Sequence, residues 1–326
     1  MDWQKLDQEV SRLHGKRLEY KDNFDPDLLA GNPDLKIQKA GGGYLVLPRR
    51  AEVIEEVHVI LHGSVRLPVE THWAVGPCSP EDAASTLVDN CDLGTSALGM
   101  ELAHWIARDP SSNRSLAFFD VTRVLIDANR YRIEDQMPKR PYRGAPVLRS
   151  DLSTSQKRSL LKQWLSPWVD LASAAITGNG VLRVFHHHTY DPVGQVGQPL
   201  DRSFGMPRPA GMVFLKSPHE TVGSPTATAS TLVEPKFLKR VVARLQEHLR
   251  QIQPEAEVLV DWPYVCPLMP LLPEVLARQH PPGPSPRMAT IIYEVRKDLL
   301  RREEGLYAVV KAIQEISDDA QAFQSA

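Results

Sequence analysis

The sequence lacks paired cysteines and long apolar runs. Its 3 cysteines, Cys78, Cys91 and Cys266, stand far apart without a CxxC pair, so neither a disulfide framework nor a thiolate zinc site is expected. No run approaches the roughly 18 apolar residues of a membrane helix, and the first residues lack the basic and then apolar pattern of a secretory signal. These absences predict a cytoplasmic protein with reduced, mostly buried thiols.

An excess of positive charge is also missing. The chain has 38 Lys and Arg residues against 40 Asp and Glu residues, which gives a net charge of −2. This balance argues against a nucleic-acid partner, which would need a basic surface to meet the phosphate backbone. A membrane partner is not expected either.

The order of apolar and amphipathic stretches predicts an α/β fold. The 326 residues, 42% of them hydrophobic, can bury a large core. Apolar runs alternate with amphipathic stretches, as they do in βα units. Strands are expected at 44–47, 57–61, 116–119, 124–126, 181–185, 212–215, 258–260 and 290–295, and helices at 95–108, 155–176, 235–252 and 303–317.

The first 50 residues differ from the rest of the chain. A short polar amphipathic stretch and a loop rich in Asp, Asn and Pro lead to Gly41-Gly42-Gly43 and an expected edge strand. No Lys-Ser or Lys-Thr pair follows the glycines, as it would in a P-loop, so they indicate a turn with positive φ. We expect residues 1–50 to be an N-terminal extension packed on one main domain, residues 51–326.

Two histidines occupy positions that suit metal ligands. His62 follows one expected strand, and His186, His187 and His188 end another. Side chains alternate along a strand, so His186 and His188 share a face while His187 points away. Neutral imidazole is the commonest metal ligand, and catalytic zinc takes three protein ligands and leaves one position for water. The pattern favours His62 and His188 as zinc ligands, with a hydrogen-bonded structural role as the alternative for each.

The third ligand should be a carboxylate or another histidine. Asp92 lies just before the helix expected at 95–108 and is the first choice, although Asp at such a place also caps helices and forms turns. Glu70 and His72 are rivals. Val65 stands where the His-x-x-Glu arrangement of carboxypeptidases needs a glutamate, so the acid must come from elsewhere. Glu56 and His58 are expected to be structural.

Asn129 and Arg130 indicate a binding site for a carboxylate. They follow Asp127 and the strand expected at 124–126. An Arg fork beside an amide binds a carboxylate through several fixed hydrogen bonds. The alternative is an ion pair between Arg130 and Asp127 or an acid on the surface. Arg123 could stabilise an oxyanion or face the solvent.

Glu294 is the candidate general base. It interrupts the apolar run at 290–295. A carboxylate at the end of a central strand is costly to bury unless it is paired or used in chemistry. A salt bridge to Arg296 or Lys297 is the alternative, and the opposite orientation of adjacent strand residues weakens it.

In this order the motifs resemble those of the N-formylglutamate amidohydrolase family, a relative of the zinc carboxypeptidases. The resemblance spans roughly residues 57–300. The family has a strand-end histidine motif, an Asp-Gly-Thr segment that opens a helix, a strand ending in Asp-x-Asn-Arg, a His-Ser-Phe-Thr-Pro-Val type motif and a Glu-Ile-Arg-x-Asp-Leu type motif. Here they read His62-Gly63-Ser64, Asp92-Leu93-Gly94-Thr95, Ile126-Asp127-Ala128-Asn129-Arg130, His188-Thr189-Tyr190-Asp191-Pro192-Val193 and Glu294-Val295-Arg296-Lys297-Asp298-Leu299.

The resemblance implies a fold and a reaction. The fold is a three-layer α/β arrangement like that of zinc exopeptidases, with a mixed central sheet flanked by helices. The reaction is the metal-assisted hydrolysis of N-formyl-L-glutamate to formate and glutamate, the last step of one histidine-degradation route. Two departures, His-Gly-Ser for His-Ser-Gly and Tyr190-Asp191 for Phe-Thr, indicate that the pocket and the substrate can differ.

The residues and the resemblance together give one expected site. Zinc would lower the pKa of its water toward roughly 7. Glu294 would take the proton of the water as it attacks the formyl carbon and return it to the leaving amine. The metal ligands are His62, Asp92 and His188, the oxyanion is stabilised by Arg123, the carboxylate of the small-molecule substrate is bound by Asn129 and Arg130, and Tyr190 is expected to contact the substrate.

Other functions stay open at this point. A hydrolase of other N-acylamino acids, or a carboxypeptidase-like peptidase, would keep the same metal and base. A non-catalytic ligand-binding protein on the same fold would not need Glu294.

Overall fold

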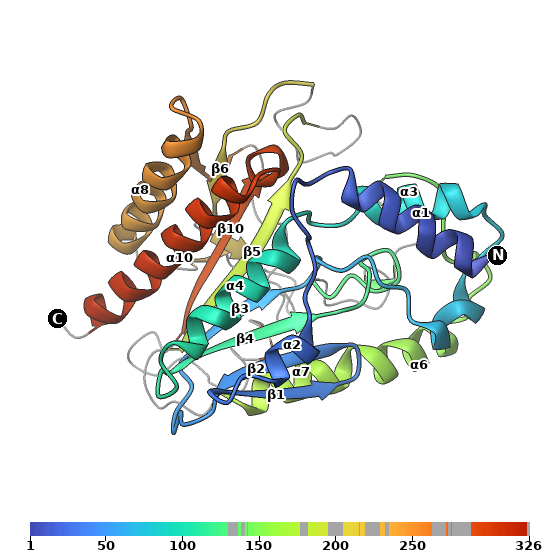
Figure 1. Cartoon of the computed structure of the whole chain (residues 1–326), viewed down its shortest axis with the longest axis horizontal. Coiled ribbons are helices and arrows are strands. Elements are labelled where there is room, and N and C mark those ends of the chain that lie inside the picture. The colour runs from blue at the N-terminus through green and yellow to red at the C-terminus, as the bar shows by residue number, and fades with distance from the viewer. Residues whose placement is uncertain are drawn as a thin grey trace. The chain divides into compact units, whose positions relative to one another are not determined.

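The computed structural model in Figure 1 divides the chain into two compact units. Unit 1 is Met1–Thr177 with Pro270–Leu272, and unit 2 is Gly178–Met269 with Pro273–Ala326. The structure describes residues 1–129, 136–137, 141, 143–176, 182–194, 205–214, 216–218, 229–231, 235–262, 272, 275 and 288–324. The predicted domain boundary after residue 50 stays a prediction.

Unit 1 contains a mixed sheet of four strands. The strands are β1 (Leu35–Ala40), β2 (Gly43–Pro48), β3 (Glu56–Ile60) and β4 (Arg114–Phe119). β2 pairs antiparallel with both β1 and β4, and β4 pairs parallel with β3. The strands predicted at 44–47, 57–61 and 116–119 are therefore confirmed. The strand at 44–47 was predicted to be an edge strand, but β1, which was not predicted, pairs with it and forms the edge of the sheet. Gly41 has a φ of 51°, which confirms the predicted turn.

Helices cover both faces of this sheet. The helices of unit 1 are α1 (Trp3–Gly15), α2 (Pro26–Ala30), 3-10 helix η1 (Val69–Ala74), α3 (Pro80–Asp89), α4 (Thr95–Ala107), α6 (Thr154–Trp164) and α7 (Ser166–Ala174). Phe118 belongs to the same buried cluster as Met100 of α4. Its neighbour Phe119 lies 5.2 Å, between ring centroids, from Trp168 of α7. Adjacent strand residues face opposite sides, so α4 and α7 lie on opposite faces and unit 1 has three layers.

Two predictions for unit 1 are wrong. The helix predicted at 155–176 is two helices, α6 and α7, that meet at Leu165. Pro167 explains the break, because it has no N–H to donate and its ring crowds the preceding turn. The strand predicted at 124–126 is a buried turn, in which the N–H groups of Leu125 and Ile126 both donate to the carbonyl of Thr122.

Unit 2 has its own mixed set of strands. β5 (Leu182–Tyr190) pairs parallel with β10 (Met288–Arg296), β10 pairs antiparallel with β6 (Gly211–Val213), and β6 pairs parallel with β9 (Val258–Val260). A separate hairpin consists of β7 (Lys216–Pro218) and β8 (Ala229–Thr231). The strands predicted at 181–185, 212–215, 258–260 and 290–295 are present. β5 extends past its predicted end, so the three histidines lie within it.

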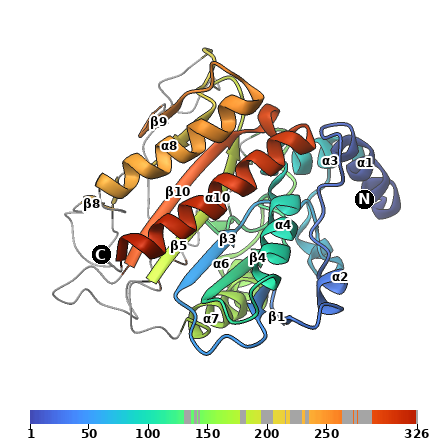
Figure 2. The same cartoon turned by 60° about the vertical axis from the view of Figure 1, so that its left-hand side comes forward.

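Two long helices pack against each other in unit 2. α8 (Pro235–Ile252) and α10 (Glu303–Gln324) lie side by side, and the short 3-10 helix η2 (Lys297–Leu300) precedes α10 (Figures 1 and 2). The helix predicted at 235–252 is confirmed, and both of its ends agree with the prediction. Its apolar positions form one buried stripe, as the sequence pattern indicated. The helix predicted at 303–317 is present and continues to Gln324.

The α/β class and the mixed sheet flanked by helices are confirmed. The main sheet has both parallel and antiparallel neighbours. None of the described helices combines the length and the apolar character needed to cross a membrane.

Candidate metal centre

In unit 1 a buried carboxylate fixes the orientation of His62. His62 lies two residues past the end of β3 and is 1% exposed. Its Nε2 is 2.9 Å from Oδ1 of Asp127, whose side chain is fully buried. An ionised carboxylate only accepts hydrogen bonds, so Nε2 is the donor in this contact, and in a neutral imidazole Nδ1 is then the nitrogen that can bind a metal. Metal-binding histidines have this arrangement, with the second ring nitrogen donating to a carboxylate.

The other ring nitrogen of His62 faces Asp92. The distance from Nδ1 of His62 to Oδ2 of Asp92 is 3.5 Å, longer than the usual hydrogen bond of about 2.7–3.2 Å between nitrogen and oxygen. Two ligands that each lie about 2.1 Å from a tetrahedral zinc ion are about 3.4 Å apart. The spacing of His62 and Asp92 thus fits two ligands of one ion.

The backbone joins the segments that carry these two residues. The N–H of Asp92 donates to the carbonyl of His62 at 2.9 Å. The next carbonyl, that of Gly63, accepts from Oγ of Ser96 at 2.9 Å and from Sγ of Cys91 at 3.1 Å. The relative position of His62 and Asp92 is therefore set by short contacts between the end of β3 and the turn before α4.

Gly63 leaves no room for a side chain at this junction. A Cβ at this position would lie 2.8 Å from Oγ1 of Thr95 and 2.9 Å from Oγ of Ser96. The His-Gly-Ser order thus has a steric reason in this chain, because only glycine lets the start of α4 approach the end of β3 so closely.

Arg123 contacts both carboxylates next to His62. Its Nε donates to Oδ2 of Asp127 at 3.2 Å, and its Nη1 lies 4.0 Å from Oδ1 of Asp92. Its side chain is 18% exposed. Arg123 thus supplies a positive charge beside two buried acids. Its predicted contact with an oxyanion stays a prediction.

Asn129 lies beside this group, and Arg130 falls outside the described residues. The backbone N–H of Asn129 donates to Oδ1 of Asp127 at 3.1 Å. Its side-chain oxygen is buried, and no described residue donates a hydrogen bond to it. The binding of a substrate carboxylate by Asn129 and Arg130 stays a prediction.

In unit 2 His188 and Glu294 occupy facing positions on neighbouring strands. β5 and β10 pair parallel with Glu294 in register with His188. The rings of His186 and His188 are stacked with centroids 5.9 Å apart, whereas His187 hydrogen-bonds with the hydroxyl of Tyr293. The predicted alternation along this strand is therefore confirmed. His188 is 6% exposed and Glu294 is half-buried.

Tyr190 is held by the protein itself. Its hydroxyl donates to the carbonyl of Pro209 at 2.6 Å, and the guanidinium of Arg208 lies 5.4 Å from the centre of its ring. Burial, and then the charge of Glu294, raise the pKa of Tyr190 well above its usual value. The phenol is therefore a neutral donor at physiological pH. Its predicted contact with the substrate stays a prediction.

The remaining candidates from the sequence have other surroundings. Glu56 and His58 are fully buried and lie 3.0 Å apart, Oε1 to Nε2, as expected of structural residues. Glu70 is exposed on η1. His72, also on η1, stacks on Trp3 with ring centroids 3.4 Å apart, and burial lowers its pKa.

Two residues near the site gave no separate signal in the sequence. Asp127 appeared there only as a companion of Arg130, yet its carboxylate binds His62 across 65 positions of sequence. Asp22, which lies between α1 and α2, accepts two hydrogen bonds from the backbone that follows Asp92. Neither contact leaves a periodic pattern, so only the fold shows it.

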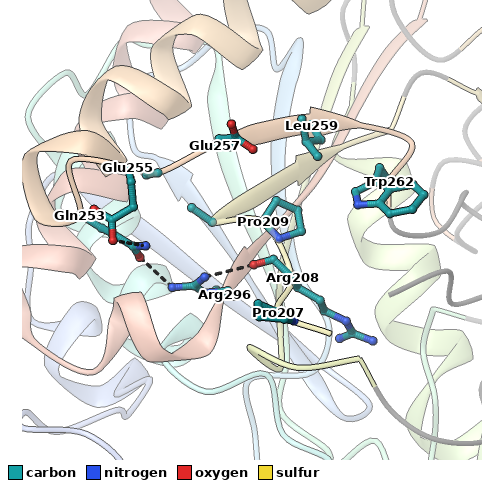
Figure 3. Close-up of a pocket in the computed structure, with 11 residues that line it drawn as sticks. Pro207, Arg208, Pro209, Gln253, Glu255, Glu257, Leu259, Trp262 and Arg296 are labelled. Atoms are coloured by element: carbon teal, nitrogen blue, oxygen red, sulfur yellow. Dashed lines mark hydrogen bonds between the residues drawn. The ribbon is translucent and has the colours of Figure 1, made fainter. Parts of the chain in front are cut away.

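Unit 2 also has a pocket of about 240 Å³, shown in Figure 3. It lies among the segment before β6, the loop after α8, and β9. Arg296 of β10 donates from its side chain to the carbonyl of Arg208, to Gln253 and to both oxygens of Asp298. None of the predicted site residues is part of the described lining. Of the predicted site residues of unit 2, Tyr190 contacts this lining, through Pro209 and Arg208.

Comparison with known proteins shows that solved structures have a fold similar to that of this chain. No protein-family model matches the chain, and no curated protein does. The gene product Atu2144 from Agrobacterium tumefaciens is similar, with a TM-score of 0.51 and 15% identity over 85% of this chain and 93% of that chain. At this identity the likeness shows the fold alone.

Two peptidase structures are more distant. The LapA aminopeptidase from Legionella pneumophila has a TM-score of 0.39 and 10% identity over 96% of this chain and 69% of that chain. A metallo-carboxypeptidase from Burkholderia cenocepacia has a TM-score of 0.37 and 11% identity over 89% and 68%. These scores are too low to carry an argument about this chain.

Proposed function

We propose that this protein is a metal-dependent hydrolase that cleaves the amide of an N-acylated amino acid. The observation that carries the proposal is the arrangement of His62, with Asp127 at one ring nitrogen and Asp92 3.5 Å from the other. The 3.5 Å spacing between Nδ1 of His62 and Oδ2 of Asp92 is close to the separation of two ligands around one tetrahedral zinc ion. A ligand pair oriented by an outer carboxylate is what a zinc site needs.

We propose His188 as the third ligand. His188 is buried, as His62 and Asp92 are, and each of the three offers one atom that can bind a metal ion. Two imidazoles and one carboxylate match the donor sets of catalytic zinc, which keep a further position for water. Bound zinc supplies an acidic water and polarises the carbonyl of the substrate.

Glu294 is proposed as the general base. It stands in register with His188 on the adjacent strand, so the two side chains leave the same face of the strand pair. A half-buried carboxylate can accept a proton from the attacking water and return it to the amine that leaves. The proton thus starts on the water and ends on the product nitrogen.

The proposed substrate is N-formyl-L-glutamate, with formate and glutamate as products. The motif from Asp127 to Arg130 and the resemblance of the sequence to the N-formylglutamate amidohydrolases support this choice. Asn129 offers a buried amide next to the fixed carboxylate of Asp127. Arg130 would pair with the α-carboxylate of the substrate through two hydrogen bonds, and Arg123 would stabilise the oxyanion.

The first experiment is to measure formate release from N-formyl-L-glutamate by purified protein before and after treatment with a chelator. We expect turnover that the chelator abolishes and added zinc restores. A panel that includes N-acetylated amino acids and peptides runs beside it. Turnover of another panel member but not of N-formyl-L-glutamate would contradict the proposed substrate. No turnover of any member by zinc-loaded protein would contradict the proposal that the protein is a hydrolase.

The proposed carboxylate contact has its own test. Arg130→Ala should raise KM strongly, because it removes a charge-assisted pair with the substrate. Arg149→Ala is a suitable control, since that arginine is exposed and pairs with Asp151 on the surface. An unchanged KM in Arg130→Ala would show that this residue does not bind the carboxylate.

A further inference from the structure

Helix α4, which follows Asp92, begins without a cap of its own. Its N-cap residue is Gly94, which has a φ of 87° and makes no side-chain cap hydrogen bond. Four other helices of unit 1, α1, α2, α3 and α6, are capped by the side chain of their N-cap residue, namely Asp2, Asp25, Ser79 and Ser153. The first N–H groups of a helix need an acceptor, so α4 must obtain one from elsewhere in the chain.

Asp22, between α1 and α2, supplies this acceptor. Its Oδ2 accepts from the N–H of Gly94 at 2.7 Å, and its Oδ1 accepts from the N–H of Ala97 at 2.9 Å. The side chain is 1% exposed, and Nε2 of His14 lies 3.3 Å from Oδ2. A carboxylate at a helix N-terminus forms strong hydrogen bonds and interacts favourably with the helix dipole.

The capped segment is the one that carries Asp92. Asp92 lies two residues before Gly94, its carbonyl accepts from Oγ1 of Thr95 at 2.6 Å, and its N–H donates to the carbonyl of His62 at 2.9 Å. The turn is thus held by Asp22 at one end and by the end of β3 at the other. Loss of Asp22 leaves the N–H groups of Gly94 and Ala97 without their acceptor.

We propose that Asp22 is a positioning residue of the metal centre, which acts through α4 to hold Asp92 at ligand distance from His62. The N-terminal extension then belongs to the site although it provides no ligand. This inference rests on the proposed function, because it takes Asp92 to be a metal ligand.

The test measures zinc affinity of the full-length protein in competition with a chromophoric chelator. Residues that orient metal ligands typically affect affinity 10- to 100-fold, so Asp22→Ala should raise the Kd for zinc by about tenfold or more. Asp25→Ala is the matched control. Asp25 also accepts two backbone hydrogen bonds, from Asp27 and Leu28, but it caps α2, which carries no site residue. The Kd of Asp25→Ala for zinc should equal that of the wild type.

Each outcome separates the inference from the proposed function. If Asp92→Ala weakens zinc binding and Asp22→Ala binds as the wild type does, the inference is wrong and the metal site stands. If Asp92→Ala also binds as the wild type does, both are wrong.

A milder variant covers the case in which Asp22→Ala does not fold, as judged by circular dichroism. Asp22→Asn keeps the shape but can accept only one of the two hydrogen bonds through its oxygen. A rise in Kd of about threefold or more is then expected. Wild-type affinity in this variant would overturn the proposal.

Discussion

Replacing Asp127 by Asn should weaken metal binding more than it weakens the fold. The carboxylate accepts from Nε2 of His62 at 2.9 Å, from Nε of Arg123 at 3.2 Å and from the N–H of Asn129 at 3.1 Å. An amide of the same shape places an NH₂ group among these donors. The imidazole of His62 can then change its tautomer, so that the proton lies on Nδ1, the nitrogen that faces Asp92. This change removes the lone pair that a metal needs.

The expected loss of zinc affinity follows from the contact between Asp127 and His62. Loss of the carboxylate partner of a metal-binding histidine typically costs 10- to 100-fold in affinity, which corresponds to about 1.4–2.7 kcal/mol. The assay is chelator competition for zinc at neutral pH, together with urea unfolding of the metal-free protein. Chelator competition should show the full loss of zinc affinity. Urea unfolding should show a smaller loss in the free energy of unfolding, about 1 kcal/mol, which is the cost of one rearranged hydrogen bond.

Asp120→Asn is the matched control for this prediction. Asp120 is also mostly buried and accepts from Oγ of Ser64 at 2.8 Å and from Nη1 of Arg66 at 2.7 Å, and neither of these partners is a histidine. Burial raises the pKa of Asp120, and its two partners oppose this rise. The reasoning is refuted if Asp127→Asn binds zinc within about twofold of the wild type, or no more weakly than Asp120→Asn does.

Three further predictions concern the base, the junction at Gly63 and pH. Glu294→Gln should lower kcat by about 10²- to 10⁴-fold in steady-state assays and leave the Kd for zinc unchanged; a normal kcat would rule this residue out as the base. Gly63→Ala should lose about 1–3 kcal/mol in urea unfolding because its Cβ would lie within 3.0 Å of Thr95 and Ser96, whereas Gly15→Ala, with no atom within 4 Å, should not be destabilised in this way. The pKa of His72 is lowered in the folded state by burial, so below its unfolded pKa the unfolded state binds more protons and the fold loses stability. The free energy of unfolding of the wild type should therefore fall more between about pH 7.5 and about pH 5.5 than that of His72→Phe, and parallel pH curves would contradict this.

Local sequence pattern predicted the elements whose burial is periodic. Helix α8 was predicted with both ends correct because its apolar residues repeat along one face. The predicted helix at 155–176 failed at Pro167, where backbone chemistry outweighs an otherwise helical composition. β1 was missed because its residues, Leu35–Ala40, alternate between buried and exposed too irregularly for a strand pattern.

The site was predictable in its residue types and not in its contacts. The sequence could mark His62 and Asp92 as candidates, since each ends or precedes a regular element. It could not show that Asp127 binds His62 or that Asp22 caps α4, because these partners lie 65 and 72 residues apart. Such contacts depend on how the strands and helices are ordered in space, which periodicity does not encode.

The anchoring of Arg296 has a consequence for the timescale on which Glu294 moves. Arg296 stands two residues after Glu294 on β10, and its guanidinium ties this strand to Asp298, Gln253 and the carbonyl of Arg208. Backbone amides of a strand held in this way exchange with solvent only when a large part of the structure opens. The strand that carries Glu294 should therefore exchange its amides slowly and present the carboxylate in one place over many turnovers, leaving adaptation to different substrates to other parts of the chain.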